Sequence, residues 1–420
     1  MIDLDSLVDP DRGLVSARIF QDEEIYRMEQ EKIFGRCWLY LAHESQIPNP
    51  GDYVAAKMGE DPIIVTRGQD GKVHAFLNAC RHRGAKVCRS DSGTSKAFRC
   101  PFHGWTYSCE GELVGVPRYK EVYFEELDKS KWGLVPVTKV DSVYGLIFGT
   151  WDPNAPTLQE YLGDMLFYLD LMFNRAEGGV EVIGGVHKWV IPTNWKIPAE
   201  NFGGDHYHLL FTHGSGIQIK ARDPLSNNGF LIFTPEGHSC GQEFAGAQRG
   251  EAVNSEYNNY IAEIKKRVAE QKGEVEAKLT PIGVGTIFPN LSFMDTMRFR
   301  TIRLWQPLGP NKIEVNSWCV VDKNMSDELK QIARRGYQLT FGPNGMFELD
   351  DGEVWMSITE AIQGYKGRTI DFNYQMGMGH EISAEEFFGK KGIPGTMNET
   401  FMHEGTHRNY YRRWKQLMMS

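Results

Sequence analysis

The chain has 420 residues, which is long enough for two domains, since single hydrophobic cores stop growing at about 250–300 residues. Apolar residues make up 41% of it and charged residues 24%, as in soluble globular proteins. The net charge of −9 argues against nucleic acid as a partner, because phosphate binding needs clustered lysine and arginine.

The ends and the hydropathy of the chain give no sign of export or membrane insertion. The first residues, MIDLDSLVDPDRG, lack the basic start and apolar core of a signal peptide. No apolar run approaches the ~20 residues that span a membrane. The seven cysteines are odd in number and scattered, which favours metal ligands and buried thiols over disulfides. We therefore expect a cytoplasmic protein with no membrane partner.

The first part of the chain predicts one helix and then a domain of strands. Residues 20–35 have the apolar spacing of a helix. From 36 to 155, short β-type runs such as PIIVTR and YGLIFGTW alternate with Gly, Asp and Ser turns, which predicts an all-β domain. One long helix is expected at 158–173.

The rest of the chain mixes strands and helices. Helices are expected near 255–272, 326–340 and 398–418, and strands at VIGGVHKWVIP, GFLIFT, TIFPNLSF, FRTIRLWQPL and IEVNSWCVV. The later strands follow one another through short turns, which predicts an antiparallel sheet with packed helices. The sequence thus predicts an α+β fold, with an all-β domain at 36–155 and a second domain formed by 1–35 and 156–420.

The strongest chemical signal is CRHRGAKVCRSDSGTSKAFRCPFHGW. It contains Cys80-x-His82 and, 17 residues later, Cys100-x-x-His103. Chance would place both pairs within 25 residues roughly once in a hundred such chains. Two Cys and two His suit either a tetrahedral zinc or a Rieske [2Fe–2S] cluster, in which the Cys bind one iron and the His the other. Spacing alone leaves both possibilities open.

A second concentration of metal-binding residues is DHYHLLFTH, residues 205–213. A helix is expected from Pro198, with its end marked by Gly214 and Gly216. Gly203 and Gly204 cost ~1 kcal/mol each inside a helix, so they suggest a distorted turn.

Helix geometry does not choose among the three histidines of this stretch. On a regular helix His206 and His213 lie about 10 Å apart along the axis, which is awkward for one ion. His208 and His213 converge only if the last turn loosens. That pair is therefore possible but not required by the spacing.

The two motifs together resemble those of aromatic ring-hydroxylating oxygenases. CRHRG…CPFHGW is similar to the Rieske motif of that family, and Asp205, His208 and His213 fit its Asp-x-x-His-x₄-His iron pattern. The resemblance implies a third iron ligand at Asp351, in FGPNGMFELDDGEVW. Two His and one carboxylate leave positions open for O₂ chemistry at Fe(II). Without the resemblance, the acidic pair would suggest a helix N-terminus.

The resemblance covers nearly the whole chain and is closest to the large (alpha) subunits of the naphthalene, biphenyl and polycyclic aromatic branch. It implies cis-dihydroxylation of an aromatic ring, with electrons from NAD(P)H through a reductase and a ferredoxin. It also implies a small beta subunit in an α₃β₃ assembly, in which Asp205 links His208 to the cluster ligand His103 of a neighbour. The alternatives are a Rieske monooxygenase or demethylase, and a dioxygenase acting on an aromatic carboxylate.

An apolar substrate needs an apolar, aromatic pocket. Pocket candidates, each of which could equally belong to the core, are Asn201, Phe202, Leu209, Asn290, Phe341 and Phe347. His206 has no place in the ligand pattern and is added to these candidates.

Residues 403–407, HEGTH, match the His-Glu-x-x-His motif of zinc proteases. Composition alone gives roughly 0.04 chance matches, and no His, Asp or Glu follows His407 to serve as a third ligand. The segment also resembles the C-terminal helix of the oxygenase family. We therefore expect no protease site here.

Overall fold

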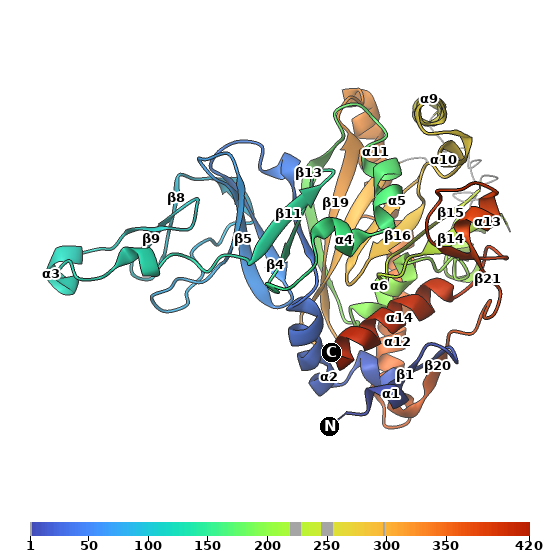
Figure 1. Cartoon of the computed structure of the whole chain (residues 1–420), viewed down its shortest axis with the longest axis horizontal. Coiled ribbons are helices and arrows are strands. Elements are labelled where there is room, and N and C mark those ends of the chain that lie inside the picture. The colour runs from blue at the N-terminus through green and yellow to red at the C-terminus, as the bar shows by residue number, and fades with distance from the viewer. Residues whose placement is uncertain (1, 219–227, 245–254, 297–298) are drawn as a thin grey trace. The chain divides into compact units, whose positions relative to one another are not determined.

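The computed structural model describes residues 2–218, 228–244, 255–296 and 299–420. The chain divides into two compact units, Phe34–Leu158 and a second unit formed by Met1–Ile33 with Gln159–Ser420 (Figure 1). In the described part of the chain, no helix is long and apolar enough to cross a membrane.

The unit Phe34–Leu158 is built from three small antiparallel sheets. The strand order is β6-β5-β4-β7 in the first sheet, β10-β9-β8 in the second and β11-β12-β3 in the third. Their bounds are β3 Leu39–His43, β4 Asp52–Met58, β5 Asp61–Arg67, β6 Val73–Leu77, β7 Ser92–Thr94, β8 Ala97–Arg99, β9 Thr106–Ser108, β10 Leu113–Gly115, β11 Lys139–Val143 and β12 Leu146–Thr150.

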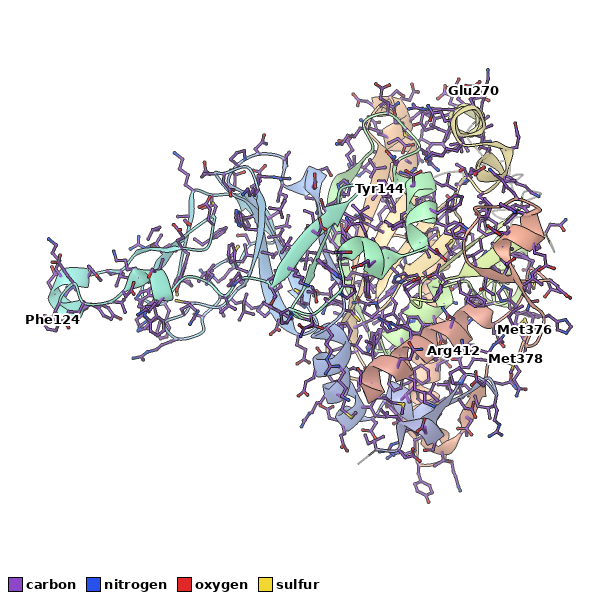
Figure 2. The ribbon with its side chains drawn as sticks, viewed as in Figure 1. Phe124, Tyr144, Glu270, Met376, Met378 and Arg412 are labelled. Carbon is purple, nitrogen blue, oxygen red and sulfur yellow. The ribbon has the colours of Figure 1, made fainter. Side chains whose placement is uncertain are left out.

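The turn between β11 and β12 determines the register in which these two strands pair. Val143 pairs with Leu146, which leaves a two-residue turn of Tyr144 and Gly145 between β11 and β12. Both residues have positive φ, 51° and 83°, as a type I′ hairpin turn requires. Figure 2 labels Tyr144 at this turn, and Phe124, which is 72% exposed, just after α3 (Tyr119–Tyr123).

The second unit is organised around a nine-stranded sheet whose neighbouring strands are all antiparallel, in the order β13-β19-β18-β17-β16-β15-β14-β22-β21. Every residue of β18 is buried, as expected for a central strand. With packed helices, this sheet confirms the predicted α+β fold. The strands are β13 Val180–Ile191, β14 Gly229–Phe233, β15 Ser239–Glu243, β16 Val284–Ile287, β17 Leu291–Asp295, β18 Arg300–Pro307, β19 Ile313–Asp322, β21 Glu381–Ser383 and β22 Thr396–Asn398.

Helices and a small sheet complete this unit. The small sheet joins β1 (Val8–Asp9), β2 (Leu14–Ser16) and β20 (Asp371–Asn373). The helices are α1 Leu4–Leu7, α2 Glu23–Glu29, α4 Leu158–Leu162, α5 Met165–Phe173, α6 Lys196–Phe202, α7 Leu209–Thr212, α8 Gly214–Gln218, α9 Ser255–Gln271, α10 Glu274–Lys278, α11 Asp327–Thr340, α12 Met346–Gln363, α13 Ala384–Phe388 and α14 Gly405–Met419.

Helix α6 lies where strands and helices meet. It packs against β16 and β17, and the Thr286 hydroxyl donates to the carbonyl of Ala199 at 2.7 Å. The C-terminal helix α14 contacts α6, and Figure 1 shows the two close together. In the same region, the indole of Trp414 and the amine of Lys196 both donate to Glu29.

Two predicted helices are wrong in extent. The single helix expected at 158–173 is split, because Gly163 has φ +47° and a Cβ there would come within 2.4 Å of the Glu236 carboxylate. The helix expected at 398–418 begins only at Gly405, because Thr396–Asn398 pairs as β22 with β14 and β21.

Candidate metal centres and active site

The Cys-His motif residues of the first unit sit on two similar tight loops. The amide of Gly84 donates to the carbonyl of Cys80 at 2.8 Å, and that of Gly104 to the carbonyl of Cys100 at 3.0 Å. Both glycines have positive φ, 75° and 76°, a conformation that other residues adopt at a cost. Each loop therefore turns back directly after presenting its Cys and His.

The side chains of these loops point toward a common place. Cys80 and Cys100 are 3% and 2% exposed, whereas His103 is exposed. The Nδ1 atoms of His82 and His103 lie 3.1 Å apart, and the His82 ring stacks on Trp105 at 5.0 Å. Burial, together with the nearby charge of His103, lowers the pKa of His82, which favours the neutral imidazole that binds metals.

This geometry bears on the choice between zinc and a cluster. Ligand atoms of a tetrahedral zinc site lie close to one another, since each bond is only about 2.0–2.3 Å long. Over the described ranges, the one group of His, Cys, Asp and Glu that converges in this way is elsewhere. The arrangement of the four motif residues is therefore compatible with a larger two-iron cluster.

Neighbouring polar groups hold the cysteine side of this centre. The Tyr107 hydroxyl lies 3.2 Å from the Cys80 sulfur and accepts the amide of Arg81 at 3.0 Å. The Asn78 amide group donates to the carbonyl of Cys88 at 2.7 Å and accepts its N–H at 3.0 Å. A hydroxyl beside a ligand sulfur is a known way to set a cluster's reduction potential.

The histidine-rich stretch is not one continuous helix. Helix α6 ends at Phe202, and Gly204 follows with φ +137°. The predicted end at Gly214 and Gly216 is wrong, because helix α8 begins there. Gly216 instead permits close packing, since a Cβ at this position would lie 2.6 Å from the Phe347 ring.

The broken backbone brings three predicted residues together. The Nε2 atoms of His208 and His213 each lie 3.4 Å from Oδ1 of Asp351. These three ligand atoms are within 4.8 Å of one another and form a group that could hold a metal ion. The Nε2 atom of His208 is buried and has no hydrogen-bond partner among the described residues. Such an atom fits a metal ligand, because buried polar atoms otherwise have partners.

A second carboxylate faces the other side of each histidine. Nδ1 of His208 lies 3.5 Å from Asp205, and Nδ1 of His213 lies 3.2 Å from Asp350. Carboxylates in this position orient metal-binding imidazoles.

The same contacts shift the ionisation of the stretch. Burial lowers the pKa of His208, but the nearby carboxylates of Asp205 and Asp351 outweigh it and raise the pKa to about 10. Burial alone would raise the pKa of Asp205, but the contact with His208 holds this pKa well below its usual range. The site therefore attracts a cation, and a metal at Nε2 would take the place of a proton.

Asp351 does not cap a helix. Helix α12 begins at Met346 after Gly345, so Asp351 lies beyond its first turn, and it is only 3% exposed. The helix presents this carboxylate inward, toward the two histidines.

A cavity adjoins the three-residue group. Val284 and Met294, which pair across β16 and β17, line it and were not among the predicted pocket residues. Their signal was weak because both are ordinary apolar residues of buried strands. The other lining residues are Asn201, Phe202, Asp205, His206, His208, Leu209, His213, Phe341 and Asp351.

Two pocket candidates lie outside this lining. The Asn290 side chain donates to the carbonyl of Trp305 at 3.0 Å and so ties the turn between β16 and β17 to β18. The Phe347 ring packs against His213 at 4.9 Å and against Phe341 at 5.6 Å. Phe347 therefore supports the ligand and the wall from behind.

His206 is 6% exposed and borders the cavity. Its ring packs on Phe401 at 4.9 Å, and Nδ1 lies 3.4 Å from the carbonyl of Gly204.

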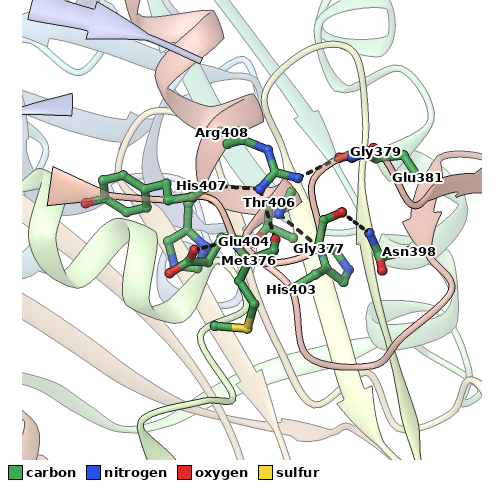
Figure 3. Close-up of polar contacts among 12 residues, drawn as sticks. Met376, Gly377, Gly379, Glu381, Asn398, His403, Glu404, Thr406, His407 and Arg408 are labelled. Carbon is green, nitrogen blue, oxygen red and sulfur yellow. Dashed lines mark hydrogen bonds and ion pairs between the residues drawn. The ribbon is translucent and has the colours of Figure 1, made fainter. Parts of the chain in front are cut away.

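The HEGTH segment forms a set of polar contacts (Figure 3). The His403 ring accepts the amide of Gly405 at 3.0 Å, and its Nε2 lies 3.2 Å from the carbonyl of Leu231. The Glu404 carboxylate accepts the amide of Met376 at 2.8 Å. Both ring nitrogens of His403 are thus engaged in contacts with backbone groups.

Comparison with known families covers both units. Residues 37–131 match the Rieske [2Fe-2S] domain, and residues 176–418 match the ring hydroxylating alpha subunit (catalytic domain). These two domains carry a Rieske cluster and a mononuclear iron that reacts with O₂.

Individual relatives match over the full length. The chlorobenzene dioxygenase subunit alpha of Cupriavidus sp. (strain PS12) is 40% identical over 100% of this chain and 94% of its own. The biphenyl dioxygenase subunit alpha of Paraburkholderia xenovorans (strain LB400) is 39% identical over 98% of this chain and 92% of its own. A naphthalene 1,2-dioxygenase structure with indole in its active site has a TM-score of 0.90, with 34% identity over 99% of this chain and 94% of that one. The chain therefore belongs to the Rieske-type ring-hydroxylating dioxygenases, as an alpha subunit.

Proposed function

We propose that this alpha subunit cis-dihydroxylates an aromatic hydrocarbon. The observation that carries the proposal is the convergence of His208, His213 and Asp351 at the edge of a cavity with an apolar wall. The overall reaction would combine the arene with O₂, two electrons and two protons to give a cis-dihydrodiol.

The residue roles follow from the two centres. Cys80, His82, Cys100 and His103 would hold the [2Fe–2S] cluster, and His208, His213 and Asp351 the mononuclear Fe(II). When bound, iron with three protein ligands offers open positions for O₂ and, with the cluster, the two electrons of the reaction. Asp205 and Asp350 would fix the two imidazoles so that both Nε2 atoms face the ion.

The cavity favours a substrate without charge. Phe202, Leu209, Val284, Met294 and Phe341 supply its apolar wall, and none of the lining residues described is a lysine or arginine. A carboxylate on the substrate would need such a partner or several hydrogen-bond donors. Relatives named for benzene, chlorobenzene, biphenyl and naphthalene support the same class. An aromatic carboxylate or a demethylation substrate is the alternative.

We also propose a ring of three alpha subunits with small beta subunits, served by a ferredoxin and its NAD(P)H-dependent reductase. His103 and Phe102 are exposed, so the histidine side of the cluster can meet a second molecule. In the same stretch of chain as Asp205, the aromatic side chains of Tyr207 and Phe211 are 57% and 80% exposed. In this assembly Asp205 would receive electrons from His103 of a neighbouring copy.

Product analysis tests the proposal. The purified oxygenase, with ferredoxin and reductase, is given arenes of one to four rings and aryl acids under ¹⁸O₂. The expected products are cis-dihydrodiols of uncharged arenes that carry both labelled atoms. Products with one labelled atom, or turnover of aryl acids alone, would establish an alternative. Co-purification with a small beta subunit checks the assembly.

A further inference from the structure

A carboxylic acid held by two tyrosines lies near the proposed electron entry point. Glu200 is in helix α6, five positions before Asp205. The Tyr374 hydroxyl lies 3.0 Å from both of its carboxylate oxygens, and the Tyr411 hydroxyl also hydrogen-bonds it. The two tyrosines are 7% and 0% exposed, and their rings are in contact at 5.4 Å.

This group belongs to a wider set of charges. The HEGTH segment, which the metal chemistry leaves unused, places Glu404 and His407 close enough to interact electrostatically with Asp205. The Tyr374 ring also packs against His407 at 5.7 Å. The titratable or charged groups that act on Glu200 are Lys196 from α6, Asp205, Tyr374, Glu404, and Tyr411 from α14.

Three carboxylates, Glu200, Asp205 and Glu404, share this space, and two nearby cations among the described residues are paired with other carboxylates. Lys196 pairs with Glu29 at 2.6 Å, and Arg408 pairs with Glu381. Carboxylates that sit near one another in a buried setting cannot all remain charged, so one of them takes a proton. His208 keeps Asp205 charged, so the proton goes to Glu200 or Glu404.

We propose that Glu200 binds one proton when an electron reaches the catalytic site and releases it when that site is oxidised again. The proton comes from solvent and returns to it. Glu200 therefore affects the step at which protons are taken up. The net reaction still takes two protons and two electrons for each dihydrodiol. The inference rests on the proposed function, because it assumes redox chemistry at the His208–His213–Asp351 group. Glu200 thus acts through its own charge and does not contact the substrate.

The ionisation of Glu200 suits this role. Burial and the charges of Asp205 and Glu404 raise its pKa to about 8, against the opposing hydrogen bonds of Tyr411 and Tyr374. A cation at the metal site lowers this pKa, and each added electron raises it again. Because this pKa is close to neutral pH, a change of one nearby charge is enough to add a proton to Glu200 or to remove it.

The first test is an infrared difference titration of the iron-loaded enzyme. The carbonyl stretch of a protonated carboxylic acid should appear as pH falls, with a midpoint that is higher in the reduced than in the oxidised enzyme. Glu200→Gln should remove this signal. The matched control is Glu276→Gln, which removes a buried carboxylate paired with Lys390 and should leave the signal unchanged.

Two further variants should move the midpoint in opposite directions. Tyr374→Phe removes a donor to the charged form and should raise the midpoint by about one pH unit, a tenfold change in proton affinity. Glu404→Gln removes a like charge and should lower the midpoint. These shifts remain measurable even if Glu200→Gln does not fold.

A potentiometric titration of the mononuclear iron gives an independent readout. Between the oxidised and reduced midpoints, the potential should fall by about 59 mV per pH unit, because each unit is a tenfold change for a one-electron couple. Glu200→Gln should flatten that slope. The inference is overturned if the carboxylic acid signal survives in Glu200→Gln, or if Tyr374→Phe and Glu404→Gln shift it in the same direction. Neither result depends on substrate turnover, so each is separate from a failure to form dihydrodiols.

Discussion

Each candidate metal centre is held by polar groups that contact the ligands from behind. The Tyr107 hydroxyl contacts the Cys80 sulfur, and Asp205 and Asp350 contact the two imidazoles. These contacts fix ligand orientation before any metal binds, and they also change the charge that the ligands donate. Single substitutions at these positions should therefore alter metal properties without removing a ligand.

The reduction potential of the cluster should depend on Tyr107. Tyr107→Phe removes a hydroxyl 3.2 Å from the Cys80 sulfur. That hydrogen bond favours the more negative, reduced cluster, so its loss should lower the potential. A bond worth about 1.4 kcal/mol corresponds to about 59 mV for one electron. Redox titration followed by electron paramagnetic resonance measures the shift. Tyr123→Phe, in the same core, should leave the potential unchanged.

Mononuclear iron should depend on Asp351 while the cluster does not. Asp351→Ala removes one of the three converging ligand atoms, and two histidines alone bind Fe(II) weakly. The expected result is loss of the mononuclear iron with full retention of acid-labile sulfide and of the visible spectrum. Glu353→Ala, an exposed position on the same helix, is the control. Stoichiometric catalytic iron in Asp351→Ala would place the third ligand elsewhere.

Among the elements, those with a regular apolar period could be predicted closely. The charged helix expected at 255–272 is α9, Ser255–Gln271, and the strand run 299–308 contains β18, Arg300–Pro307. The helix interrupted at Gly163 was predicted as too continuous, because φ cannot be read from periodicity, whereas Gly203 and Gly204 had indicated a distorted turn. Gly163 and Gly204 both adopt positive φ, and each breaks an element that the apolar pattern would continue.

The candidate site shows the same limit. The spacing of His208 and His213 allowed them to share a metal. It could not predict that their side chains converge, because the convergence depends on the break in the backbone at Gly204. Asp351 lies on another helix and came only from the resemblance to a family. Val284 and Met294 line the cavity through sheet pairing, which is a tertiary property without a local signature.

The aromatic wall of the cavity is supported by a buried ion pair between a strand and a helix. Arg303 of β18 pairs with Glu348 of α12, and its guanidinium lies over the rings of Phe202 and Phe341 at 5.0 and 5.2 Å. It also donates to the carbonyl of Phe341. This arrangement ties the wall to the helix that carries Asp351.

Loss of Arg303 should therefore destabilise the catalytic unit. Arg303→Leu leaves the Glu348 carboxylate buried without its partner, which costs about 3–5 kcal/mol in comparable pairs. Chemical denaturation of the catalytic unit measures the loss in unfolding free energy. The double variant Arg303→Leu/Glu348→Leu should recover much of that loss, since no unpaired charge remains. If the double variant is no more stable than the single one, packing over the aromatic rings dominates instead.

At the scale of the whole molecule, each compact unit contains one complete set of candidate ligands. The Cys-His loops lie within Phe34–Leu158, and the His-His-Asp group lies within the other unit. Electrons must therefore pass between centres that lie in different compact units. Asp205 is the group through which we propose that they arrive, and Asp350 provides a control with a similar contact.

Asp205→Asn and Asp350→Asn remove the same kind of carboxylate, each from the Nδ1 side of one proposed iron ligand. If both residues only orient histidines, both variants should weaken iron binding by about 10–100-fold and recover with added Fe(II). If Asp205 also conducts electrons, only Asp205→Asn should retain a chemically reduced Rieske cluster that fails to reoxidise in the presence of substrate and O₂. Stopped-flow absorbance of the cluster in iron-saturated enzyme measures this step. Equal reoxidation rates in the two variants would contradict the proposed route, because the carboxylate would then act through histidine orientation alone.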